Sequence, residues 1–236
     1  MLSFLYLITV FILLAVFIGG MIIMKYFKNE TLTNVIFCSL TFICYFFVVL
    51  IAYIKNGPHD WNFTNTLPTA NVSPFMFFVS PIFFILPKQI RKYFATLIAL
   101  LVVGMILSPV ITCIRNFAIN YKFHASFLFD YFGHIIFALW GVYLYRTKQC
   151  DLDIKSSLIG GAIIITVALI MLVINVIFDQ SFFGLSLNNK HSIYNMKLVD
   201  NSYLSALIYF TGLLVVLTIG YFAQKLIIKI TKEIDN

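Results

Sequence analysis

The chain has 236 residues, of which 61% are hydrophobic, 17% aromatic and only 11% charged, and its formal net charge is +7. Soluble domains carry roughly 25% charged residues, so this composition excludes a water-soluble globule. The mean hydropathy of +0.98 indicates a polytopic membrane protein, and we expect one all-α membrane domain over residues 1–236.

Seven apolar stretches between charged residues are candidate membrane spans. Crossing a hydrocarbon core of about 30 Å takes about 20 helical residues, and all but the third stretch are long enough. The third has 14 residues and would extend only about 21 Å as a helix. The first lacks the basic start and cleavage site of a signal peptide, so we interpret it as an uncleaved span. The stretches are residues 1–24, 32–54, 74–87, 93–114, 125–145, 156–178 and 202–224.

Basic residues are distributed unevenly between alternate loops. One side carries 11 of them: Lys25, Lys28, Lys88, Arg91, Lys92, Arg146, Lys148, Lys155, Lys225, Lys229 and Lys232. The other side carries 5: Lys55, Arg115, Lys122, Lys190 and Lys197. The positive-inside rule then predicts the N-terminus outside and the C-terminus in the cytoplasm. We expect membrane lipids as partners and no nucleic acid, while membrane-protein partners stay open.

Cofactor and metal motifs are absent from the sequence. There is no nucleotide-binding glycine loop, no HExxH and no GxSxG. The cysteines form no CxxC and offer neither a disulfide framework nor a zinc site. We therefore expect no cofactor and no metal, and buried apolar roles for Cys38, Cys44, Cys113 and Cys150.

Two ionisable residues lie well inside the fifth span. Asp130 and His134 are four residues apart and so share one helical face. Ala138 and Gly141 continue that face and would allow close approach of a neighbouring helix, so it points into the bundle. Asp130 could accept the ring proton of His134 and raise its basicity. A functional site is one interpretation of the pair, and a hydrogen bond that fastens two helices is the other.

The segment before the short third span is rich in polar and turn-forming residues. We expect Ser73 as the N-cap of a helix with Pro74 at its first position, while Pro81 would kink the span and Pro87 would end it. A re-entrant lead-in over residues 65–74 would expose helical N–H groups as an anion or oxyanion site. A plain capped helix in a locally thinned bilayer is the alternative.

Polar residues at the outer ends of other spans could contribute to the same vestibule. Arg115 would supply a cation at the end of the fourth span, and Asn175 a hydrogen bond at the end of the sixth. With Asn71 of the lead-in, they are our candidate substrate-binding residues. Arg115 as an interface anchor and Asn175 as a solvated helix end are the alternatives.

The stretch LPTANVSPF at residues 67–75, followed two spans later by FLFDYFGHIIFALWGVYLY at 127–145, resembles the YwaF-like integral membrane proteins of bacteria. These are related to eukaryotic membrane acyltransferases and, more distantly, to androgen-induced fatty-ester hydrolases. The resemblance implies lipid acyl chemistry run by a nucleophilic Cys or Thr with a histidine, which His134 matches. Where the family often has Leu-Cys, this chain has Thr69-Ala70, which leaves Thr69 or Ser73 as candidate nucleophiles.

Three functions are compatible with these features. In the first, a lipid ester hydrolase or acyltransferase, Thr69 or Ser73 attacks an acyl carbonyl and His134, oriented by Asp130, accepts the proton. The second is a proton-coupled transporter or binding protein for a small solute or lipid headgroup. The third is an accessory membrane subunit in which the Asp130–His134 pair only fastens helices.

Overall fold

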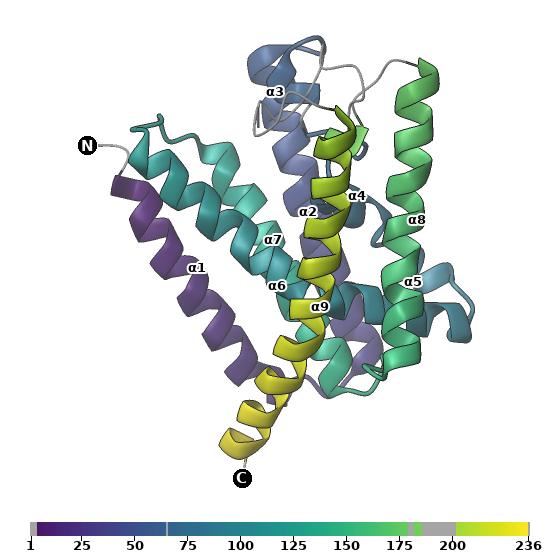
Figure 1. The fold of residues 1–236 in the computed structure, drawn as a ribbon. Helices are drawn as coiled ribbons and strands as arrows, with labels where there is room; N and C mark the ends of the chain where they lie inside the picture. The colour runs from purple at the N-terminus through teal and green to yellow at the C-terminus, as the bar shows by residue number, and fades with distance from the viewer. Residues whose placement is uncertain (1–3, 65, 179–181, 186–201, 236) are drawn as a thin grey trace.

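The computed structural model describes residues 4–64, 66–178, 182–185 and 202–235 as a bundle of helices (Figure 1), and these residues contain no strand. The all-α prediction is therefore confirmed. In chain order the elements are α1 (Phe4–Ile23), η1 (Met24–Tyr26), α2 (Glu30–Asn56), α3 (Trp61–Thr64), α4 (Val72–Val79), α5 (Ile82–Ile85), α6 (Lys88–Ala118), α7 (Ala125–Arg146), α8 (Ile154–Phe178), η2 (Phe182–Gly184) and α9 (Ser202–Asp235).

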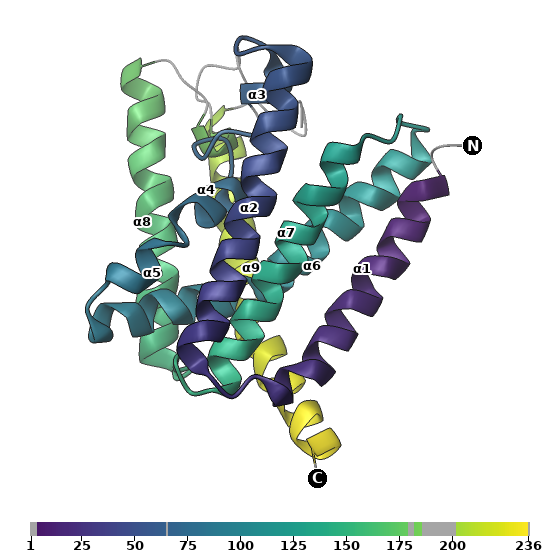
Figure 2. The ribbon, with the colours of Figure 1, turned by 180° about the vertical axis from the view of Figure 1, so that it is seen from behind.

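Within the described ranges, six helices are long and apolar enough to cross a membrane, namely α1, α2, α6, α7, α8 and α9. Each corresponds to one predicted span. The predicted third span, residues 74–87, folds as the two short helices α4 and α5. Together they carry the chain from the end of α2 toward the start of α6 (Figures 1 and 2).

Alternate loops lie at opposite ends of the bundle. In Figure 1 the N-terminal end of α1 lies in the upper half and the C-terminal end of α9 at the bottom. The loops that carry the 11 cations lie in the lower half, together with the C-terminal end of the chain. The predicted outer loop 179–201 lies outside the described residues apart from 182–185.

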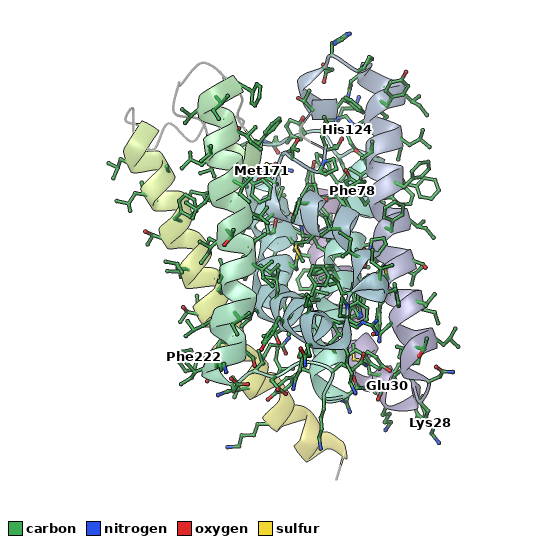
Figure 3. All side chains as sticks on the ribbon, turned by 90° about the vertical axis from the view of Figure 1, so that its right-hand side faces the viewer. Lys28, Glu30, Phe78, His124, Met171 and Phe222 are labelled. Carbon is green, nitrogen blue, oxygen red and sulfur yellow. The ribbon has the colours of Figure 1, made fainter. Side chains whose placement is uncertain are left out.

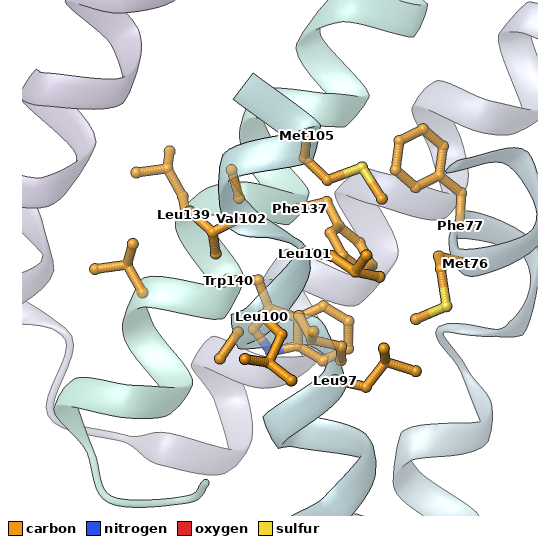
Figure 4. Packing of buried hydrophobic residues seen from close by; sticks show 14 of the residues in the cluster. Met76, Phe77, Leu97, Leu100, Leu101, Val102, Met105, Phe137, Leu139 and Trp140 are labelled. Atoms are coloured by element: carbon orange, nitrogen blue, oxygen red, sulfur yellow. The ribbon is translucent and has the colours of Figure 1, made fainter. Parts of the chain in front are cut away.

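The core is centred on the pair α6 and α7, which cross the middle of the bundle obliquely (Figure 1). Trp140 and Phe137 of α7 are fully buried and pack with leucines of α6 (Figure 4). A Cβ added at Gly141 would lie 2.5 Å from Cγ2 of Val102 and 2.9 Å from the carbonyl oxygen of Ile98. The predicted close approach along the His134 face is therefore confirmed, because only a glycine fits there.

A polar chain inside the core joins α2 to α7. The indole N–H of Trp140 donates to Oδ1 of Asn34 over 2.9 Å, and Nδ2 of Asn34 donates to Oε1 of Gln149 over 2.7 Å. Asn34 is only 4% exposed. Buried polar groups are costly unless they are bonded in this way, so these contacts fix how α2 lies against α7.

The third pass breaks at Ser80 and Pro81. Proline lacks the N–H that would bond the carbonyl four residues earlier, which is that of Phe77. The Ser80 hydroxyl donates to this carbonyl over 2.8 Å and replaces the missing bond. The predicted kink at Pro81 is confirmed.

Backbone irregularity continues to the start of α6 and is satisfied by one arginine. Nη2 of Arg91 donates to the carbonyl oxygens of Phe84 and Leu86 over 3.1 and 3.0 Å. Pro87 is the N-cap of α6, so the predicted end of the pass at Pro87 is confirmed. Irregular backbone in a membrane protein persists only where such partners satisfy it.

Candidate functional site

A cavity of about 360 Å³ lies between α2, α4, α6 and α7. It extends from the ends of α2 and α6 down to His134 on α7. Along α7 it runs from His124 to His134, about 15 Å at 1.5 Å per residue. Figure 3 shows His124 near the upper end of the bundle and Phe78 of α4 below it. The cavity therefore reaches from the predicted outer surface toward the middle of the molecule.

His134 forms the inner end of the cavity, and its ring is only 4% exposed. Its Nδ1 lies 2.8 Å from the carbonyl oxygen of Asp130 and 3.4 Å from Oδ1 of the same residue. Both are acceptors, so the proton of the neutral ring lies on Nδ1 and Nε2 carries the lone pair. Nε2 is buried and has no hydrogen-bond partner among the described residues. The neutral imidazole thus keeps a buried nitrogen free to act as a base, on a residue that lines a polar cavity.

Packing fixes the plane of that ring. The Phe77 ring meets it edge to face, with centroids 5.0 Å apart. A Cβ at Gly133 would lie 3.2 Å from Cβ of Cys44 and 3.4 Å from Cε2 of Phe77. Because α2 and α4 both close on α7 here, the imidazole has little freedom to rotate away from the cavity.

The first turn of α4 faces the same cavity. Asn71 and Ser73 both line it, as predicted. The N-cap of α4 is Asn71 and the helix begins at Val72, so the prediction that Ser73 is the N-cap is wrong by two positions. The reason is a turn that ends just before it, in which the N–H of Ala70 donates to the carbonyl of Leu67 over 2.9 Å. The N–H groups of Val72 and Ser73 belong to the first helical turn, so neither has an acceptor within the helix.

Thr69 and Asn175 do not line the cavity. The carbonyl of Thr69 accepts from the N–H of Phe183 over 2.7 Å. Asn175 holds the η2 turn: its Nδ2 donates to the carbonyls of Phe182 (2.8 Å) and Leu185, and its Oδ1 accepts from the N–H of Phe182 over 2.7 Å. Asn175 therefore fixes the η2 turn, and the backbone of η2 in turn binds the segment that precedes α4 at Thr69.

Basic side chains gather at the outer mouth. Lys55 at the end of α2, Arg115 near the end of α6 and His124 before α7 all line the cavity. Burial lowers the pKa of His124 below its ordinary value, and the like charges of Lys55 and Lys122 lower it further. Arg115 therefore lines the vestibule, and its role in binding a substrate stays a prediction. The mouth suits an anionic group, while Asp130 puts a carboxyl deeper inside.

Several lining residues escaped the sequence analysis. On α6 the hydroxyls of Ser108 and Thr112 precede Arg115 at spacings of four and three, which is one helical face. Tyr45 and Lys55 mark a similar face of α2. This polar spacing within apolar helices is the signal that could have identified both walls.

No group of three metal-ligating side chains occurs in the described part of the chain. Comparisons of the whole chain with protein-family models, curated proteins and solved structures find no match. The resemblance to the YwaF-like proteins therefore stays a prediction. The site has to be interpreted from its own geometry.

Proposed function

We propose that this protein is a lipid ester hydrolase or acyltransferase of a bacterial plasma membrane, with Ser73 as nucleophile and His134 as general base. The observation that carries the proposal is that His134, a residue at the inner end of a polar cavity, has a buried Nε2 with no hydrogen-bond partner among the described residues. Leaving such an atom without a partner costs about 1–3 kcal/mol. Perturbed or unsatisfied groups of this kind concentrate at functional sites.

Ser73 is preferred to Thr69 because it lines the cavity together with His134, whereas Thr69 does not. Ser73 makes no hydrogen bond to Nε2 of His134, which has no partner among the described residues. Such bonds commonly tighten only when substrate is bound. The position of His134 at this cavity is compatible with the resemblance to the YwaF-like family, whose helix histidine it matches.

In the first step, Nε2 of His134 takes the proton of Ser73 Oγ as Oγ bonds to the acyl carbon. The carbonyl electron pair moves to its oxygen, and the backbone N–H groups of Val72 and Ser73, in the first turn of α4, are candidates to stabilise that charge. Collapse of the intermediate breaks the ester C–O bond. The imidazolium gives its proton to the departing alcohol oxygen, which leaves an acyl-Ser73.

In the second step, water or an acceptor alcohol attacks the acyl carbon while His134 again takes the proton. The intermediate collapses, the C–O bond to Ser73 breaks, and Oγ regains its proton from the imidazolium. Water yields a fatty acid, and an alcohol yields a new ester. Asp130 keeps the proton of the neutral ring on Nδ1 and stabilises the imidazolium in both steps.

The test places purified protein in liposomes of phospholipids with isotope-labelled acyl chains and follows acyl release or transfer by mass spectrometry. His134→Asn and Ser73→Ala are each expected to lower turnover by at least about 100-fold. Thr69→Val is the matched control for Ser73→Ala, because it removes a lead-in hydroxyl outside the cavity. His59→Asn, at an exposed position, is the control for His134→Asn.

Turnover by the wild type that survives in His134→Asn would contradict the assignment of the base. Turnover lost in Thr69→Val and kept in Ser73→Ala would move the nucleophile to Thr69. An acyl-enzyme trapped by rapid acid quench should carry its acyl group on Ser73.

A second candidate function, proton-coupled transport or binding, is favoured by one specific observation. Asp130 is partly exposed in the cavity above the buried His134, so two titratable groups lie in line from the mouth inward. This function predicts proton flux or ligand binding that depends on pH around the histidine range, with no covalent change in the lipid. Wild-type liposomes that release no acyl product but acidify under a solute gradient would support it over hydrolysis.

A further inference from the structure

A second cavity of about 360 Å³ lies between the first turn of α4 and the helices α6 and α9. Its walls are nearly all apolar: Val72, Leu101, Met105, Leu213 and Val216 line it, and the hydroxyls of Ser73 and Tyr209 are the polar groups on them. Cavities that hold small apolar ligands begin at about this size. We call this space the α6–α9 groove.

Two glycines keep the groove open. A Cβ added at Gly212 of α9 would meet no atom within 4 Å, so this glycine faces empty space. A Cβ at Gly104 of α6 would meet only Cγ1 of Val216, at 2.9 Å. Elsewhere α9 approaches α6 as closely as helices can: a Cβ at Gly220 would overlap the carbonyl oxygen of Leu100. The groove is therefore a local widening of a tight helix pair.

Ser73 lines both the groove and the polar cavity of His134. Ser73 thus belongs to the wall of a polar compartment with cations at its mouth and also to the wall of an apolar one. This division matches an amphiphile with a charged headgroup and a hydrocarbon tail, joined by an ester. Helices α6 and α9 are both apolar enough to cross a membrane, so the surroundings of the groove supply such molecules.

We propose that the α6–α9 groove binds one acyl chain of a membrane phospholipid and so presents the ester of that chain to Ser73. The role of Ser73 in this inference rests on the proposed function, whereas occupation of the groove does not. Lys55 and Arg115 line the neighbouring polar cavity, which shares Ser73 with the groove, and they complement the phosphate of the same lipid. Gly212 sets the room available to the chain.

The test uses liposomes that contain a phospholipid with a photoactivatable diazirine in one acyl chain. After illumination, the labelled residues of the full-length protein are located by tandem mass spectrometry. Labels are expected to concentrate on Leu101, Met105 and Leu213 over the exposed, lipid-facing Leu169 of α8. Gly212→Phe should lower groove labelling about tenfold, the effect of excluding roughly two methylene groups from burial.

The matched control is Gly19→Phe on α1, because a Cβ there also meets no atom within 4 Å while Gly19 lines neither cavity. Groove labelling no higher than that of Leu169, or unchanged in folded Gly212→Phe, would overturn the inference. Mapping of the wild type decides the question even if Gly212→Phe does not fold. Photolabelling does not require turnover, so the two proposals can fail separately. A labelled groove without acyl release would refute the hydrolase alone. Acyl release with an unlabelled groove would refute this inference alone.

Discussion

Replacing Gly141 by alanine tests whether the close approach of α7 to α6 stabilises the bundle. The added Cβ would lie 2.9 Å from the carbonyl oxygen of Ile98 and 3.3 Å from Cα of Ala99, both backbone atoms that cannot rotate away. It would also lie 2.5 Å from Cγ2 of the fully buried Val102. Ordinary contacts begin at 3.4 Å, so α7 has to retreat by about 0.5 Å along this face.

The expected cost follows from that displacement. A gap of 0.5–1 Å forfeits roughly a quarter to a half of each van der Waals contact, and overpacking of cores costs about 1–3 kcal/mol. The higher helix propensity of alanine returns about 1 kcal/mol. We expect Gly141→Ala to lower the free energy of unfolding by about 1–2 kcal/mol. Because His134 lies on the same face of α7, acyl turnover should fall as well.

The assay is reversible unfolding in mixed micelles of increasing dodecyl sulfate content, followed by circular dichroism. Gly212→Ala is the control, since its Cβ meets no atom within 4 Å. It should leave stability unchanged or raise it by up to about 1 kcal/mol. A Gly141→Ala protein as stable as the wild type would refute the close packing of α6 and α7, and so the placement of His134.

Three further predictions concern the loops. The folded pKa of His124 lies below its ordinary value of 6.5, so the unfolded chain binds the proton first as pH falls. As pH falls from about 7 toward the lowered folded pKa, the free energy of unfolding should therefore decrease, and below that pKa it should stay constant. His124→Gln should remove this decrease, as measured by unfolding titrations at a series of pH values. Burial raises the pKa of the Cys150 thiol to about 12, so in a variant with Cys150 as its only cysteine a maleimide at pH 8 should modify it only after unfolding. In a background without native cysteines, His59→Cys should react with an impermeant maleimide on intact cells, and Lys155→Cys only after permeabilisation; the reverse pattern would invert the predicted orientation.

The spans could be predicted from sequence because their physical cause is local. A run of about 20 apolar residues has to form a helix in hydrocarbon, where every backbone group needs an internal partner. The break at Pro81 is equally local, since proline lacks the N–H that a helix requires. The spacing of Asp130 and His134 placed both on one face, and the structure puts both on the wall of one cavity.

Contacts between distant segments could not be predicted in the same way. Asn175 resembles a solvated helix end in sequence, yet its amide is bonded to the backbone of 182–185, because the shape of that turn has no periodic signature. Trp140 counts as apolar in a hydropathy sum, yet its N–H fixes Asn34 of α2. The groove beside Gly212 depends on how α9 crosses α6, and one chain segment does not specify the angle at which it meets another.

The state of His134 separates a functional site from a fastener of helices. A side chain kept to fasten helices would bond from one helix to another, but Nε2 of His134 has no partner among the described residues, and Nδ1 bonds only within α7. Replacing the imidazole by an apolar ring removes the unsatisfied Nε2, which should stabilise the folded protein by about 1–3 kcal/mol. The same change removes the Nδ1 hydrogen bond, which should destabilise it by about 1 kcal/mol. We therefore expect His134→Phe, which keeps a ring against Phe77, to unfold at the same free energy or up to about 2 kcal/mol higher, with acyl turnover abolished. A loss of more than about 1 kcal/mol in the same micelle titration would instead favour the accessory subunit, because a fastening role predicts that the bundle weakens when its polar contact is removed.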